Sequence, residues 1–110
     1  MAKQIKFSTL QLEFIQLELN IIRTILKIQK PLHFTTDISY FRSVKKLNGN
    51  PAMACDTITG LIWIDEKYHC ENSMMVLQSN LWHEALHIKH PKKSERQIKQ
   101  LVRKLTGYHI

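Results

Sequence analysis

The chain has 110 residues, 44% of them hydrophobic and 23% charged, a composition that excludes intrinsic disorder and predicts one globular domain over residues 1–110. Two cysteines are too few for a disulfide framework, no apolar run reaches the roughly 18 residues of a membrane span, and the N-terminus lacks a secretory signal, so we expect a cytoplasmic protein without a membrane partner. Lysine and arginine total 16 against 9 acidic residues, and the formal net charge of +7 favours anionic partners.

The first predicted element is a helix over residues 8–30. Apolar residues recur in two rows at steps of three and four, which predicts a broad buried face and a scaffold helix beneath the rest of the domain. One row is Leu10, Phe14, Leu17, Ile21, Ile25 and Ile28, and the other is Leu12, Ile15, Leu19, Ile22 and Leu26. Ser8 with Gln11 predicts a capping box at the start, and Pro31 predicts the end.

Residues 32–68 have a composition typical of β-structure. A short strand is predicted near residues 39–47, followed by a turn at residues 48–51. Residues 52–58 and 61–65 flank a Thr-Gly turn and predict an antiparallel hairpin.

Two further helices complete the chain. Residues 74–90 show helical apolar spacing, with Asn72 or Ser73 as the N-cap. Residues 95–106 follow, with Ser94 and Gln97 as a second capping box and a glycine at the C-cap. The sequence therefore predicts an α+β fold with an N-terminal scaffold helix, a small antiparallel sheet or hairpin, a motif-bearing helix and a C-terminal helix.

The motif that carries chemistry is His83-Glu84-Ala85-Leu86-His87, an HExxH pattern within the predicted helix of residues 74–90. Histidines four residues apart lie one turn apart on the same helix face, so both imidazoles can bind one Zn²⁺ ion. Glu84 lies beside them, where it can act as a general base towards a water molecule and then as a general acid towards the leaving amine. The alternatives are an incidental motif on a surface helix and a purely structural metal site.

Three segments of the chain match the pattern of one known family. They are Gly60-Leu61-Ile62-Trp63-Ile64-Asp65, Leu81-Trp82-His83-Glu84-Ala85-Leu86-His87 and Glu95-Arg96-Gln97-Ile98-Lys99-Gln100-Leu101-Val102. Over residues 52–105 the chain resembles the ImmA/IrrE family of small zincin-like metallopeptidases. The resemblance implies a zinc-dependent endopeptidase with a minimal zincin-like fold, encoded near a phage or mobile element, whose substrate is a repressor-like regulatory protein. The alternative is a non-catalytic regulator on the same fold that binds a repressor or DNA through its basic face.

The third zinc ligand is the point at which the chain departs from the family. In that family, a glutamate on the helix after the motif binds the metal. The position of this glutamate aligns best with Gln97 of the present chain, and glutamine is a poor zinc ligand. Glu95 lies two residues earlier and is the expected third ligand, with His90, on the same helix face as His87, as the alternative. Further alternatives are Gln97 itself, a distant residue such as His69 or His109, or a site with no third protein ligand.

The resemblance also implies a binding strand, because such enzymes pair an extended peptide with a strand beside the zinc. Leu61, Ile62, Trp63 and Ile64 are the residues expected to form that edge strand. Residues suited to stabilising an oxyanion are Tyr68, Tyr108 and His109.

Basic residues gather between positions 89 and 104. They are Lys89, Lys92, Lys93, Arg96, Lys99, Arg103 and Lys104. Arg96, Lys99 and Arg103 share one face of the predicted C-terminal helix, which is either a solvated surface or a surface for DNA or an acidic protein.

Overall fold

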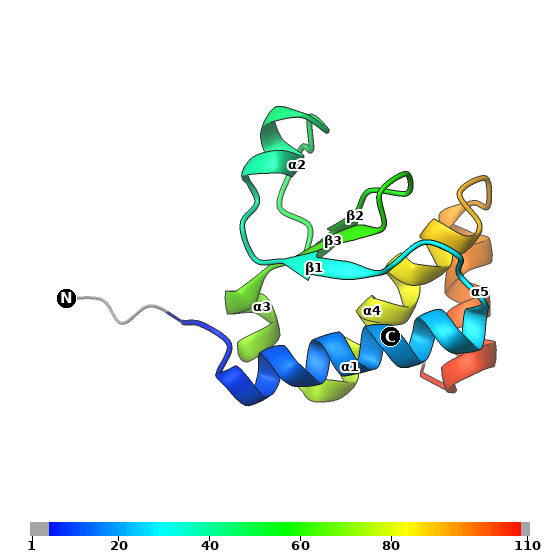
Figure 1. The fold of residues 1–110 in the computed structure, drawn as a ribbon, viewed down its shortest axis with the longest axis horizontal. Helices are drawn as coiled ribbons and strands as arrows, with labels where there is room; N and C mark the ends of the chain where they lie inside the picture. Colours follow the sequence, from blue (N-terminus) through cyan, green and yellow to red (C-terminus); the bar gives the residue numbers. More distant parts are fainter. Residues whose placement is uncertain (1–4, 109–110) are drawn as a thin grey trace.

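The order of the helices and strands confirms the predicted α+β class. The computed structural model describes residues 5–108. Within that range the elements are α1 (Thr9–Leu26), β1 (His33–Thr35), α2 (Ser39–Ser43), β2 (Met53–Cys55), β3 (Leu61–Ile64), α3 (Glu66–Cys70), α4 (Met74–Lys89) and α5 (Glu95–Thr106) (Figure 1). None of these helices combines the length and the apolar character that crossing a bilayer requires.

The core lies where α1, α4 and the sheet meet. Helix α4 packs against both α1 and β2, and α1 also contacts β1. Figure 1 shows α1 along one long side of the molecule and α2 projecting beyond the sheet, away from α1. The fully buried residues of this core are Ile15, Leu19, Ile22, Ile62, Ile64, Leu81 and Ala85.

The start of α1 is as predicted, but its end is not. Ser8 and Gln11 form the capping box. The helix ends at Leu26 rather than at Pro31, because Lys27 adopts a left-handed conformation with φ 56° as the C-cap. The Arg23 guanidinium then donates to the carbonyls of residues 29 and 30, which stabilises the turn that follows.

Only one of the two apolar rows of α1 is buried, so the predicted broad buried face is wrong. Leu19 is 0% exposed and belongs to the row that packs on α4 and the sheet. Most of the other row faces solvent, with Leu17 59% exposed and Leu10, Ile21 and Ile25 also exposed. The rest of the domain covers one side of α1 rather than wrapping around it.

This asymmetry predicts unequal effects of two matched substitutions in α1. Leu19→Ala removes a fully buried side chain and should lower the free energy of unfolding by about 2–5 kcal/mol. Leu17→Ala removes an exposed side chain and should change it by less than about 0.5 kcal/mol. Urea denaturation of both variants measures the difference, and losses of equal size would contradict this packing.

The sheet is mixed, which corrects the prediction of an antiparallel sheet. Strands β2 and β3 form the predicted antiparallel hairpin, with Ala54 opposite Trp63. Strand β1 adds to the other side of β3 in parallel, with Phe34 opposite Ile62. The order is therefore β1-β3-β2, and β3 is the central strand.

Residues 39–47 contain the helix α2 rather than the predicted strand. Asp37 Oδ1 accepts hydrogen bonds from both the backbone N–H and the hydroxyl of Ser39, which starts the helical turn. Phe41 on α2 is buried, and the Arg42 guanidinium donates to the Leu47 carbonyl. Local hydrogen bonds and the burial of Phe41 thus outweigh β propensity here. Helix α3 was also not predicted. It begins at Glu66 after the N-cap Asp65, whose side chain accepts from the Tyr68 N–H.

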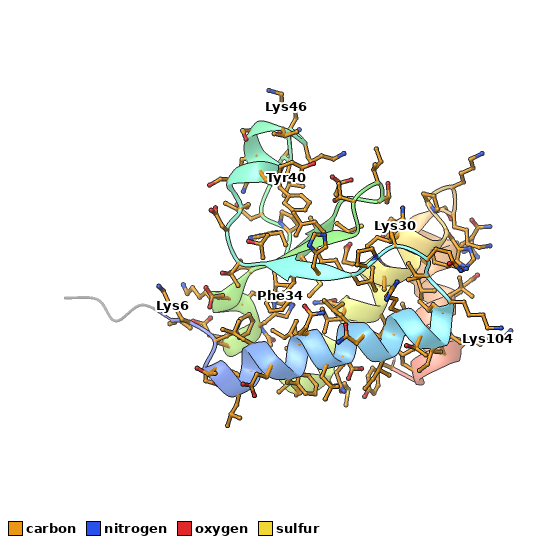
Figure 2. The ribbon with its side chains drawn as sticks, in the orientation of Figure 1. Lys6, Lys30, Phe34, Tyr40, Lys46 and Lys104 are labelled. Carbon is orange, nitrogen blue, oxygen red and sulfur yellow. The ribbon has the colours of Figure 1, made fainter. Side chains whose placement is uncertain are left out.

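The hairpin turn is held by a buried carboxylate. Asp56 is 2% exposed, and it accepts hydrogen bonds from the Tyr40 hydroxyl at 2.6 Å and the Ile58 N–H at 2.9 Å. The Tyr40 hydrogen bond, supported by backbone donors, lowers the pKa of Asp56 to about 2. Lys30 Nζ donates to the Thr57 carbonyl from the other side of the turn (Figure 2).

Asp56 should make stability depend on pH in the acid range. Its pKa is about 2 in the folded chain, against about 3.9 when unfolded, so its contribution is complete above about pH 5 and is lost as the pH falls towards 2. This difference corresponds to about 2–3 kcal/mol. Asp56→Asn should remove this contribution, so the free energy of unfolding should fall by that much less between pH 5 and pH 2 than in the wild type. A variant with the acid dependence of the wild type would contradict this role.

Candidate metal centre

Helix α4 presents the histidines of the motif away from the core. It begins at Met74 after Ser73, whose side chain accepts from the Val76 N–H, so Ser73 rather than Asn72 is the N-cap. Its apolar face is buried against α1 and the sheet. His83 and His87 lie on another face, with side chains that are 20% and 18% exposed.

Helix α5 places Glu95 opposite these histidines. A turn closed by the Lys93 N–H and the His90 carbonyl separates α4 from α5. Ser94 then caps α5, so Glu95 is the first residue of the helix. Buried Leu86 on α4 packs with Ile98 and Val102 on α5. These apolar contacts set the position of α5 and therefore the position of the Glu95 carboxylate.

The three side chains converge closely enough to bind one metal ion. His83 Nε2 lies 3.0 Å from one Glu95 oxygen, His87 Nε2 lies 2.6 Å from the other, and the two Nε2 atoms are 3.2 Å apart. Tetrahedral bonds of about 2.0–2.1 Å place neighbouring ligand atoms roughly 3.3 Å apart. Two histidines and a glutamate also form a ligand set that catalytic zinc sites use. The donor types therefore fit Zn²⁺, and the side chains need to move apart by less than about 1 Å to reach the tetrahedral separations.

The charges around the cluster favour the protonation states that bind metal. Burial, together with the charges of His87 and Lys99, lowers the pKa of His83 even though Glu95 opposes the shift. Partial burial opposes ionisation of Glu95, but the two imidazoles outweigh it and lower the pKa of that carboxyl. A neutral imidazole and an ionised carboxylate are the forms that bind a metal cation.

Glu84 lies beside the cluster in a half-buried position. Burial raises the pKa of Glu84 to about 7, the Glu95 charge adds to the effect, and a hydrogen bond from the Cys55 thiol opposes it. A carboxyl group with a pKa near 7 can both accept and release a proton near neutral pH. In turn, burial and the Glu84 charge raise the pKa of the Cys55 thiol above its usual range.

Two hollows meet at the site. One, of about 380 Å³, lies between α4, α5 and the start of β2, and its walls include Lys99 and Arg103. The other, of about 270 Å³, follows β2 and is lined by Cys55 and His87 among others. Both are lined by Met53, Glu84 and Glu95. An extended chain lying along β2 would therefore pass directly over the proposed ligands.

The prediction that residues 61–64 form an edge strand is wrong. Leu61, Ile62, Trp63 and Ile64 form the central strand β3, which β1 and β2 flank on both sides, so β3 has no free edge for a peptide. The strand beside the site is β2, which pairs with β3 on one side only. The sequence showed the hairpin but not which of its strands lies next to α4.

Among the alternatives for the third ligand, the structure brings Glu95 to the histidines and not His90. His90 is the C-cap of α4 and is not part of the cluster. Gln97 is held in the capping box, where its side chain accepts from the Ser94 N–H. His69 is buried, with its two ring nitrogens next to the Asp65 carbonyl and the Asn80 amide. His109 lies outside the described residues.

The structure also distinguishes between the two tyrosines predicted as candidates for oxyanion stabilisation. Tyr108 lines the larger hollow, and its hydroxyl donates to the Gln78 side chain at 3.1 Å. Tyr68 is exposed on α3 and lines neither of the two hollows. Only Tyr108 is therefore placed near the site.

Sequence reasoning did not find Cys55, Lys99 or Arg103 as site residues. Lys99 and Arg103 follow Glu95 by four and eight positions, a helical spacing that could have assigned them to the same side of α5. Cys55 has no comparable signal, because its place depends on how the hairpin packs on α4.

No family model matches the chain, and no curated protein or solved structure matches it significantly. The function of the site therefore has to be argued from its own residues.

Proposed function

We propose that the chain is a zinc-dependent endopeptidase of the ImmA/IrrE type that cleaves a repressor-like regulatory protein in the cytoplasm. The observation that supports this most strongly is the convergence of His83, His87 and Glu95 on one point, with Glu84 beside it. Structural zinc sites are usually closed by four protein ligands, whereas three ligands leave one coordination position open for catalysis. The geometry therefore favours a catalytic site over a structural one.

Each side chain of the site has its own role in the proposed reaction. Zinc, when bound, supplies a Lewis acid that polarises the scissile carbonyl and activates water. Glu84 accepts the proton from the attacking water and later gives it to the amine of the leaving group. Its pKa of about 7 suits both steps. His83, His87 and Glu95 hold the metal next to this carboxylate.

Strand β2 offers a place for an extended substrate. The ladder bonds to β3 at its two ends involve the Ala52 carbonyl and the Asp56 N–H. Because alternate residues of a strand bond to opposite sides, Met53 and Cys55 present their backbone groups to the free edge. A peptide that pairs there lies along both hollows and crosses the site.

The proposal is tested by incubating the zinc-loaded chain with transcriptional repressors encoded near its gene. Cleavage at a defined bond, followed by mass spectrometry, is the expected result. Glu84→Gln, loaded with zinc to the same extent, should leave the repressor intact. An intact repressor after incubation with the zinc-loaded wild type would overturn the proposed substrate.

The second candidate is a non-catalytic regulator that binds a repressor or DNA through its basic face. It is favoured by the exposed cations Lys92, Lys93 and Arg96 at the turn before α5 and on its first helical turn. This function predicts DNA affinity that falls steeply with salt and does not change in Glu84→Gln. The peptidase proposal predicts that Glu84→Gln abolishes control of the repressor.

A further inference from the structure

The larger hollow beside the metal centre carries two positive charges. Glu95, Lys99 and Arg103 are spaced by four residues, so they form one row along α5 that begins at the proposed ligand. With a rise of 1.5 Å per residue, Lys99 and Arg103 lie roughly 6 and 12 Å beyond Glu95 along the helix axis. Both line the hollow of about 380 Å³, which we call the cation cavity.

Among residues 5–108, neither of these charges has an ionic partner. The ion pairs formed within residues 5–108 involve Lys45, His83 and His87 but neither Lys99 nor Arg103. The two acids of the cavity, Glu84 and Glu95, are already assigned to proton transfer and metal binding. With Zn²⁺ balancing the charge of these two carboxylates, Lys99 and Arg103 leave the cavity with a net positive charge. An anionic group of the substrate would neutralise this charge.

We infer that the cation cavity binds a carboxylate of the substrate, held by Lys99 and Arg103. The inference rests on the proposed function, since it concerns the substrate of the same site. An extended peptide advances about 3.3 Å per residue, so distances of roughly 6–12 Å correspond to a group about two to four residues from the scissile bond. The carboxylate belongs either to an aspartate or glutamate side chain or to a free C-terminus close to the cut.

The test measures binding of inhibitors, so it does not depend on turnover. The probes are four tripeptides that carry the hydroxamate at their N-terminal end, with Asp or Asn two residues from the hydroxamate and a free or amidated C-terminus. The hydroxamate binds the zinc of the loaded full-length chain and fixes the position of the peptide. We expect a compound whose carboxylate reaches Lys99 and Arg103 to bind about tenfold more tightly than its neutral counterpart. The Asp/Asn pair and the acid/amide pair distinguish the two sources of the carboxylate.

Two sets of variants assign the effect to its residues. Lys99→Gln together with Arg103→Gln should bind all four compounds with nearly equal affinity, whereas Arg96→Gln, on the same helix but outside the cavity, should keep the preference. All three are exposed side chains, so folding is expected to persist and is checked by circular dichroism. Equal binding of the four compounds to the wild type would overturn the inference and leave the proposed function intact. A preference that survives in the double variant would overturn the assignment to Lys99 and Arg103. If the chain takes up no zinc and binds no hydroxamate, the proposed function fails as well.

Discussion

Glu84→Gln is expected to slow cleavage of the repressor about 100- to 10,000-fold, the range that loss of a general acid–base group produces. The substitution keeps the size of the side chain and removes its ability to accept a proton. Because Glu84 is beside the ligand cluster but not part of it, the zinc content should stay at the wild-type level. The rate is measured from the accumulation of the cleaved fragment under single-turnover conditions.

Glu13→Gln provides the matched control for this experiment. Glu13 is exposed on α1, away from both hollows, so the same chemical change there should leave the rate unaltered. A wild-type rate in Glu84→Gln would remove Glu84 from the mechanism.

The second large effect is expected at the third ligand. Glu95→Ala removes the carboxylate that lies 3.0 Å from His83 Nε2 and 2.6 Å from His87 Nε2, and it should weaken zinc binding by at least about 100-fold. His90→Ala should leave the affinity unchanged, because His90 lies outside the cluster. Competition with a chromophoric chelator at constant pH measures the zinc affinity of both variants. The opposite order of effects would assign the third ligand to His90 and contradict the arrangement of α5.

The Glu95 carboxylate can be removed without disturbing the helix that carries it. Its side chain is 67% exposed, and the cap of α5 comes from Ser94 and Gln97. A loss of zinc affinity in Glu95→Ala would therefore report on coordination, and an unchanged thermal midpoint of the metal-free protein would confirm this.

Local signals in the sequence predicted much of the fold. The capping boxes at Ser8 and Ser94 and the cap at Ser73 mark the starts of α1, α5 and α4, because each depends only on residues three positions apart. The hairpin was predictable for the same reason, from two β-prone segments flanking a Thr-Gly turn.

Features that depend on distant contacts were not predictable. The position of β3 between β1 and β2 results from pairing with residues about 30 positions earlier in the chain. Whether Leu17 or Leu19 faces the core depends on which side of α1 receives α4, and both rows have the same periodicity. The helix α2 was missed because its N-cap is Ile38, which makes no side-chain capping bond and so leaves no capping signal in the sequence.

The candidate site likewise contains residues that local spacing predicts and one residue that depends on a distant contact. His83, Glu84 and His87 follow from helical spacing alone, since one turn of α4 contains them all. The choice of Glu95 over His90 needs the packing of Leu86 on Ile98, a contact between two helices.

Zinc content is the measurement that tests the metal centre most directly. Protein purified without an affinity tag, reconstituted with zinc and freed of excess metal, should hold about one zinc per chain by elemental analysis. His83→Ala should hold none, because it removes one of the three proposed ligands. A wild type that retains no zinc near neutral pH, or an equal zinc content in His83→Ala, would contradict the account.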